Sequence, residues 1–255
     1  MVYELLFSAT GRSAKVADII AAEFEGEKTR LDLSDPALPA GDYSFTREDF
    51  CIFTTSVYEG RVPSPAVKNL QKLAGNGAKI LLVAVFGNRA VDDCLLEMKK
   101  EAAARGFVPV AAIEASVQHS IMPQVEPTRP DEQDTAQLKT FAQQVKQLLA
   151  EKTDFSSLAV PGNYPYLKMG GIPFKPKADK KCLDCGLCAR RCPVQAIPMD
   201  NFRITDKEKC INCMRCVEIC PVHARDFSPL LIGGAYLAMK SKFAGRKPNA
   251  IYLPE

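Results

Sequence analysis

Residues 182–193 read CLDCGLCARRCP, and residues 210–221 read CINCMRCVEICP. Both stretches follow the pattern C-x-x-C-x-x-C-x-x-x-C-P, and the second copy begins 28 residues after the first. Eight of the ten cysteines of the chain therefore lie between Cys182 and Cys220. This crowding predicts a duplicated unit that binds a metal or a cluster, rather than a scatter of disulfide bridges.

The duplicated pattern resembles that of bacterial-type ferredoxins, which hold two 4Fe–4S clusters. In that family each cluster is bound by three cysteines of one motif and by the fourth cysteine of the other motif. The resemblance implies that one cluster is bound by Cys182, Cys185, Cys188 and Cys220. It implies that the second is bound by Cys210, Cys213, Cys216 and Cys192. Zinc sites and disulfides are the alternatives, but a duplicated cysteine triplet followed by Cys-Pro is not a usual zinc spacing.

Charge is divided unevenly along the 255 residues. Residues 1–155 carry 17 Lys+Arg and 22 Asp+Glu, a balance of −5, whereas residues 156–255 carry 16 and 8, a balance of +8. A basic half could indicate nucleic-acid binding. We expect no nucleic-acid partner, because two clusters with their thiolates would cancel about half of this positive charge. No apolar run reaches the ~18 residues of a membrane span, and no signal peptide is evident, so a cytoplasmic protein is expected.

Residues 1–152 alternate apolar runs with helical patterns, which predicts an α/β domain. The expected strands are residues 2–7, 28–33, 50–55, 79–86 and 107–113, and the expected helices are residues 13–24, 64–73, 90–105 and 131–151. Continuous apolar strands suit a parallel sheet that is covered on both faces. Residues 153–178 are rich in proline, glycine and lysine and are predicted to be a linker. Residues 179–227 would form the α+β cluster domain, and residues 228–255 would form a tail with an expected helix over 230–243.

A hydroxyl-rich loop, Ser8-Ala-Thr-Gly-Arg-Ser13, follows the first expected strand and precedes a helix. Backbone N–H groups at such a helix start form an anion cradle, although a plain N-cap would use the same residues. The loop resembles the one with which flavodoxins bind the phosphate of FMN. The resemblance implies FMN bound by three loops at the carboxyl edge of a doubly wound, five-stranded parallel sheet of order 2-1-3-4-5. The implied FMN-binding residues are Ser8, Thr10, Gly11, Arg12, Ser13, Thr54, Thr55, Tyr58, Gly60, Phe86, Gly87, Asn88 and Asp93.

Taken together, the S-A-T-G-R-S loop, the segments Y-E-G-R-V-P and G-N-R-A-x-D-D, and the duplicated cysteine motif resemble the EFR-type family of flavodoxin–ferredoxin fusions. The resemblance covers nearly the whole chain. Phe86 departs from it, because a tyrosine is expected before Gly-Asn-Arg. Tyr58 is the main candidate for stacking on the flavin, since the chain has no tryptophan.

The resemblance implies an electron-transfer protein that passes electrons between FMN, the clusters and a redox partner protein. No catalytic residue is predicted. The alternatives are an FMN-dependent reductase of a small acceptor, fed by the clusters, and an iron–sulfur redox sensor. His119 could donate a proton near the flavin but is expected to be an ordinary loop residue. Cys51 and Cys94 are expected to be buried as small hydrophobic side chains.

Overall fold

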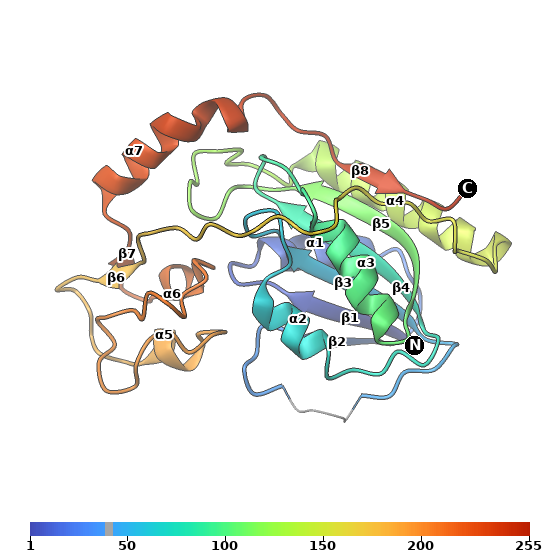
Figure 1. Cartoon of the computed structure of the whole chain (residues 1–255), viewed down its shortest axis with the longest axis horizontal. Coiled ribbons are helices and arrows are strands. Elements are labelled where there is room, and N and C mark those ends of the chain that lie inside the picture. Colours follow the sequence, from blue (N-terminus) through green and yellow to red (C-terminus); the bar gives the residue numbers. More distant parts are fainter. Residues whose placement is uncertain (39–42) are drawn as a thin grey trace.

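The computed structural model describes residues 1–38 and 43–255. Its centre is a sheet of order β2-β1-β3-β4-β5-β8, in which the first five of these strands run parallel (Figure 1). Their bounds are Val2–Phe7 for β1, Lys28–Asp32 for β2, Phe50–Ser56 for β3, Lys79–Phe86 for β4 and Val108–Ser116 for β5. The predicted order 2-1-3-4-5 is therefore confirmed, and it is the flavodoxin-like variant of the doubly wound sheet.

Helices cover both faces of this sheet. Helix α1 (Arg12–Ala21) packs beside α4 (Glu132–Glu151) on one face, and α2 (Ser64–Leu70) lies beside α3 (Cys94–Ala104) on the other. The start of α4 is fixed by a capping box, in which Asp131 and Asp134 each accept a hydrogen bond from the other's backbone N–H. Strands covered on both faces explain the unbroken apolar runs of the sequence.

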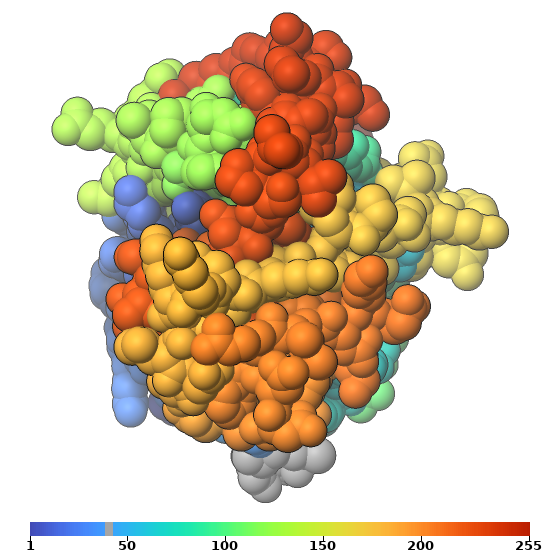
Figure 2. All heavy atoms as spheres, turned by 90° about the vertical axis from the view of Figure 1, so that its left-hand side faces the viewer, coloured from blue at the N-terminus to red at the C-terminus, as the bar shows by residue number. Residues whose placement is uncertain are grey.

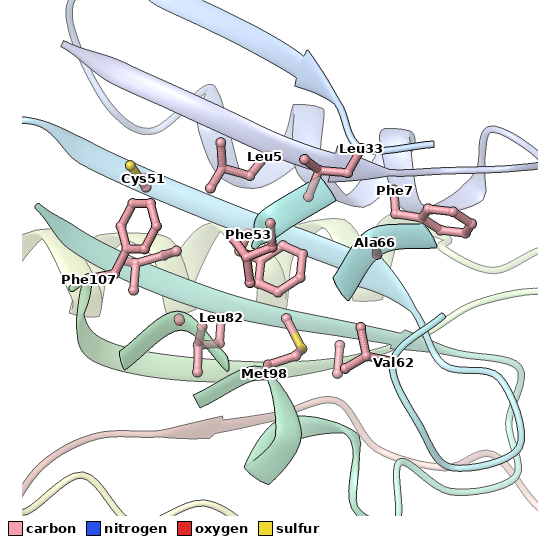
Figure 3. Close-up of a cluster of buried hydrophobic side chains, with 14 of the residues drawn as sticks. Leu5, Phe7, Leu33, Cys51, Phe53, Val62, Ala66, Leu82, Met98 and Phe107 are labelled. Atoms are coloured by element: carbon pink, nitrogen blue, oxygen red, sulfur yellow. The ribbon is translucent and has the colours of Figure 1, made fainter. Parts of the chain in front are cut away.

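Two hydrophobic clusters hold these layers together. Figure 3 shows the cluster under α2 and α3, where Phe53 lies at the centre of β3 with Leu82 and Met98 close by. Phe53 is fully buried, and burying such a side chain contributes about 1.5–3 kcal/mol. Cys51 and Cys94 are also fully buried, as predicted, and burial raises the pKa of both thiols.

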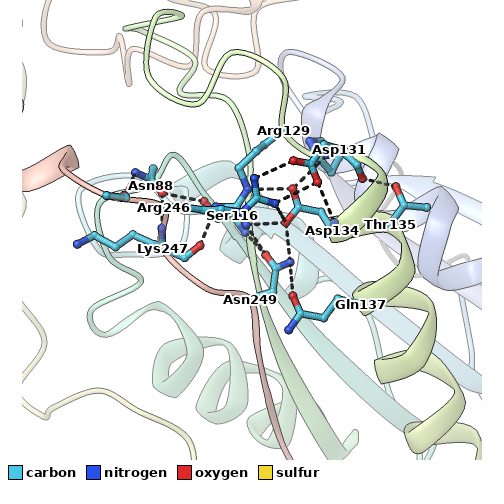
Figure 4. A network of polar contacts seen from close by, with 12 residues as sticks. Asn88, Ser116, Arg129, Asp131, Asp134, Thr135, Gln137, Arg246, Lys247 and Asn249 are labelled. Atoms are coloured by element: carbon cyan, nitrogen blue, oxygen red, sulfur yellow. Dashed lines mark hydrogen bonds and ion pairs between the residues drawn. The ribbon is translucent and has the colours of Figure 1, made fainter.

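A sixth strand, β8 (Ala250–Tyr252), extends the sheet beyond the five that the sequence predicts. It runs antiparallel to β5, with Ile113 opposite Ile251. The tail that leads into it is held by a buried polar network, shown in Figure 4. There Asn249 accepts a hydrogen bond from the backbone N–H of Ser116, and Arg129 pairs with Asp134 at 2.6 Å. The C-terminal tail is thus part of the first sheet.

The segment between α4 and the cysteine motifs runs along the first domain (Figure 1). Asp93 accepts hydrogen bonds from the backbone N–H groups of Asn163 and Leu167, at 2.8 and 2.6 Å. Arg61 donates to the carbonyl of Leu167 and lies over the ring of Tyr166. The predicted linker therefore lies fixed on the domain surface along this stretch.

The cysteine motifs fold into a small unit of short elements. These are β6 (Lys177–Ala178), α5 (Leu187–Arg190), α6 (Arg215–Glu218) and β7 (Arg225–Asp226), with β6 and β7 antiparallel. Helix α7 (Pro229–Met239) and the 3-10 turn η1 (Lys240–Phe243) then lead back towards β8, close to the predicted helix over 230–243. In Figure 2 the red segment of α7 lies above the orange cysteine-containing segments.

Candidate functional site

The loop after β1 forms a cradle at the start of α1. Gly11 precedes the helix with φ of +78°, a conformation that favours glycine. The Ser8 hydroxyl accepts a hydrogen bond from the N–H of Ala14 at 3.0 Å. The first N–H groups of an α-helix have no partners within the helix, so this turn can bind an anion.

A cavity of about 330 Å³ opens beside this cradle. One side is formed by loops at the carboxyl ends of β1, β3, β4 and β5, which is where doubly wound sheets bind ligands. The residues on this side are Thr10, Arg12, Ser13, Ser56, Val57, Tyr58, Glu59, Val85, Gly87, Arg89, Val117, Gln118, His119, Ser120, Ile121 and Met122. The opposite side is largely apolar and comes from the C-terminal part, with Ile172, Phe174, Ile211, Asn212, Ile232, Ala235, Met239 and Phe243.

Of the thirteen residues predicted to bind FMN, the cavity brings together Thr10, Arg12, Ser13, Tyr58 and Gly87. Ser8 and Gly11 shape the cradle next to it. The other six have different surroundings and are not among the lining residues: Thr54, Thr55, Gly60, Phe86, Asn88 and Asp93.

Three of these six have evident structural roles. Gly60 forms a tight turn between Tyr58 and Arg61 with φ of +81°, and a Cβ atom there would clash with the carboxylate of Asp92. Asn88 is fully buried and donates hydrogen bonds to the carbonyls of Phe243 and Gly245. Asp93 holds the segment at 163–167, as described above.

The remaining three belong to the interior of the sheet. Phe86 packs in the hydrophobic cluster under α2 and α3. Thr54 and Thr55 are fully buried near the end of β3, and the hydroxyl of Thr54 has no hydrogen-bond partner among the described residues. Alternation along a strand places Thr54 on the same face as Ser56, whose hydroxyl lies 2.8 Å from that of Ser13 at the cradle.

Several lining residues were not predicted. Gln118 accepts two hydrogen bonds from the guanidinium of Arg12, at 3.1 and 2.8 Å, and so fixes this cation at the cradle. His119, which the sequence places near the flavin as a loop residue, lines the cavity. Gln118 lies just before it, after the end of β5, so the rule that ligands bind at carboxyl strand ends could have identified Gln118 too. No sequence signal indicates the wall formed by α7 and η1.

His119 has a defined protonation state. Its Nδ1 atom accepts hydrogen bonds from the N–H groups of Ile121 and Met122, both at 3.1 Å, which leaves the proton on Nε2. Burial, together with the charges of Arg12 and Arg89, lowers the pKa of His119 to about 4. The imidazole is therefore neutral at pH 7 and offers the cavity a hydrogen-bond donor, not an acid.

Two smaller cavities lie in the cysteine-containing unit, and each is lined by four cysteines. One is lined by Cys182, Cys185, Cys188 and Cys220, which we call the distal cysteine set. The other is lined by Cys192, Cys210, Cys213 and Cys216, which we call the proximal cysteine set. In each set three cysteines come from one motif and the fourth from the other, the arrangement that the resemblance to ferredoxins implies.

The donors around these sulfurs suit an anionic cluster. Backbone N–H groups point at the fourth cysteine of each motif, from Ala196 to Cys192 at 3.3 Å and from Ala224 to Cys220 at 3.2 Å. Such N–H···S contacts stabilise thiolates that bind a cluster. Burial raises the pKa of the Cys213 thiol to about 12, and cluster ligation needs the thiolate form. Within the described residues, no three Cys, His, Asp or Glu side chains meet closely enough to share one metal ion.

The large cavity and the proximal cysteine set share a wall. Ile211 and Asn212 line both cavities, and Cys213 packs against the same hydrophobic cluster as Tyr58. Arg215, which follows Cys213 by two residues, donates hydrogen bonds to the carbonyl of Ser8 at 2.7 Å and to the hydroxyl of Ser34 at 2.5 Å. The proximal set is thus fixed directly against the cradle.

Residues 181–224 match the family model described as the 4Fe-4S dicluster domain. No protein of curated function matches the chain in sequence. Within the part of the chain that the structure describes, we find no helix with the length and apolar character needed to cross a bilayer.

Solved structures resemble the first domain. A flavodoxin from Streptococcus pneumoniae TIGR4 is 18% identical and has a TM-score of 0.39, covering 58% of this chain and 99% of the flavodoxin. Flavodoxin 2 from Bacillus cereus is 15% identical and has a TM-score of 0.36, with coverage of 57% and 96%. Rubredoxin oxygen:oxidoreductase from Desulfovibrio gigas is 16% identical with a TM-score of 0.38, and the match covers 58% of this chain but 35% of that enzyme.

The strand order and the dicluster match describe the two parts of the chain. A sheet with the flavodoxin-like order β2-β1-β3-β4-β5 is followed by a segment that matches the 4Fe–4S dicluster domain.

Proposed function

We propose that this protein transfers electrons between FMN, two 4Fe–4S clusters and a redox partner protein. The observation that carries the proposal is the shared wall: Ile211 and Asn212 separate the large cavity from the proximal cysteine set. A flavin in the first and a cluster in the second would be neighbours. The position of Cys213 against the cluster of side chains around Tyr58 supports the same pairing.

The residues around the cradle fit the phosphate of FMN. Thr10 and Ser13 supply hydroxyls, Arg12 supplies a charge held in place by Gln118, and the start of α1 supplies N–H groups. Tyr58 and the apolar wall fit the ring system of FMN. The volume of the cavity suits a small cofactor. Bound FMN would supply the exchange of one or two electrons, and the chain would orient it and exclude water.

The two cysteine sets fit one 4Fe–4S cluster each. We propose that the distal set holds the cluster that exchanges electrons with the partner. Cys185 of this set is exposed, whereas Cys213 of the proximal set is buried. These positions support the order flavin, proximal cluster, distal cluster and partner.

The alternative of a reductase with a small acceptor is less well supported. Such an enzyme needs room for its acceptor beside the flavin, but α7 and η1 form an apolar wall where that acceptor would lie. His119 is neutral at pH 7 and cannot supply a proton as an acid. Electron transfer to a protein partner needs neither an open pocket nor a proton donor.

Anaerobic purification followed by assay of iron, sulfide, zinc and FMN tests the proposal. About eight irons, eight sulfides and one FMN per chain are expected. The variants Cys192→Ser and Cys220→Ser then test how the cysteines are divided. Each should weaken the cluster of the opposite motif, as seen by EPR of the reduced protein. Zinc in place of iron, or clusters without FMN, would contradict the proposal.

A further inference from the structure

One position breaks the symmetry of the duplicated unit. The copies are offset by 28 residues, so Ile197 in the first copy corresponds to Arg225 in the second. Both residues are almost fully buried, with exposed fractions of 4% and 2%. Ile197 lines the cavity of the proximal cysteine set, and Arg225 lines that of the distal set. An apolar side chain at one site is thus replaced by a buried cation at the other.

Arg225 has no carboxylate partner among the described residues. Its guanidinium donates to the carbonyls of Phe202 and Pro176 and to the hydroxyl of Thr205. Its Nε atom is buried without a partner among the described residues. A buried charge paired only with neutral oxygens is costly, so this position indicates that an anion belongs nearby.

The nearest candidate anions are the cysteine sulfurs. Nη1 of Arg225 lies 3.9 Å from the sulfur of Cys188 in the distal set. Two of the groups to which Arg225 donates, the carbonyl of Pro176 and the hydroxyl of Thr205, belong to residues that line the cavity of the proximal set. A single guanidinium therefore lies against both sites.

We propose that Arg225 is a fixed cation shared by both clusters, which makes each of them easier to reduce. The inference rests on the proposed binding of two 4Fe–4S clusters. Reduction of a cluster adds one electron and no proton, so it adds one negative charge to the site. A nearby buried cation stabilises that added charge, because the interior screens it only weakly. The same cation also lessens the repulsion between two reduced clusters.

Redox titration monitored by EPR, under anaerobic conditions and on the full chain, tests this role. Arg225→Ile places the residue of the first copy in the second, Arg225→Gln removes the charge but keeps a polar group, and Arg225→Lys keeps the charge. In the two neutral variants we expect the equilibrium constant for reduction of each cluster to fall at least tenfold, which is about 59 mV for one electron. Arg225→Lys should remain within threefold of the unmodified protein.

Arg203→Gln is the matched control. Arg203 is exposed, donates to the carbonyl of Cys182 at 3.0 Å and pairs with Asp184, so solvent screens its charge. We expect its effect to stay within threefold. Neutral variants with full iron content and potentials within threefold of the unmodified protein would overturn the proposal.

Loss of clusters is informative as well. If the neutral variants lose their clusters while Arg225→Lys keeps them, the charge is required and the proposal stands. If all three variants lose them, the geometry of the guanidinium and not its charge is required, and the proposal fails. Lack of clusters in the unmodified protein would instead refute the proposed function.

Discussion

Arg215 offers the sharpest test of how the two halves of the protein are joined. It is almost fully buried and donates hydrogen bonds to the carbonyl of Ser8, in the cradle, and to the hydroxyl of Ser34. Hydrogen bonds to a charged group contribute about 1.5–3 kcal/mol each. Arg215→Met keeps an apolar stem of similar length but removes both bonds. We therefore expect the docking of the cysteine unit on the first domain to weaken by about 3–6 kcal/mol.

A loss of 3 kcal/mol corresponds to a rise of about 150-fold in the population of opened molecules. Hydrogen exchange measures this population directly, through the amides of α6 and of residues 8–13. The iron and FMN contents of the variant should stay unchanged. Unchanged amide protection in Arg215→Met would refute the reasoning.

Glu218→Gln is the matched control. Glu218 pairs with Arg12 across the same contact at 3.4 Å, but its side chain is half exposed. Exposed ion pairs contribute about 0–1 kcal/mol and are screened by salt. We expect Glu218→Gln to change protection by less than tenfold and to lose even this effect at high salt. An effect as large as that of Arg215→Met would mean that burial does not decide the strength of the contact.

The remaining predictions concern stability, measured by urea unfolding. Asp134→Asn breaks the buried pair with Arg129 and should cost about 3–5 kcal/mol. Burial opposes ionisation of Asp134, but its hydrogen bonds to Arg129 and other donors hold its pKa below the usual 3.8. This carboxylate therefore stabilises the fold above about pH 4, and its contribution is lost as the pH falls below that value. The free energy of unfolding of Asp134→Asn should therefore depend less on pH in that range. Asn88→Ala removes hydrogen bonds to the tail and should cost about 2–4 kcal/mol, with faster amide exchange at 243–247. Phe53→Ala opens a cavity in the core and should cost about 3–5 kcal/mol, and Phe53→Leu clearly less.

The sequence predicts the elements that local patterns determine. The five apolar runs became the five parallel strands, because buried strands and their turn residues carry strong local signals. The two sets of cysteines also came together as the resemblance implied, with Cys220 beside the first motif and Cys192 beside the second.

Features set by distant contacts could not be predicted. Strand β8 has only three residues and is defined by its pairing with β5 and by the network around Asn249. The wall formed by α7 depends on how the tail returns to the sheet, which no periodicity encodes. Asn88 was expected at the flavin because of its place at a strand end, yet its amide holds that returning tail.

The positions of Arg61, Asn88 and Asp93 explain why sequence motifs outside the cradle occur in the same chain as the cysteine unit. Arg61 and Asp93 hold the segment that leads to the cysteine motifs, and Asn88 holds the segment that returns from them. The cysteine unit is therefore fixed at both of its ends, and Arg215 fixes it in the middle. Electron transfer between a flavin and a cluster needs a constant short separation, which one flexible linker could not supply. Residues that first pointed to a cofactor thus also serve to keep the proximal cysteine set against the cavity.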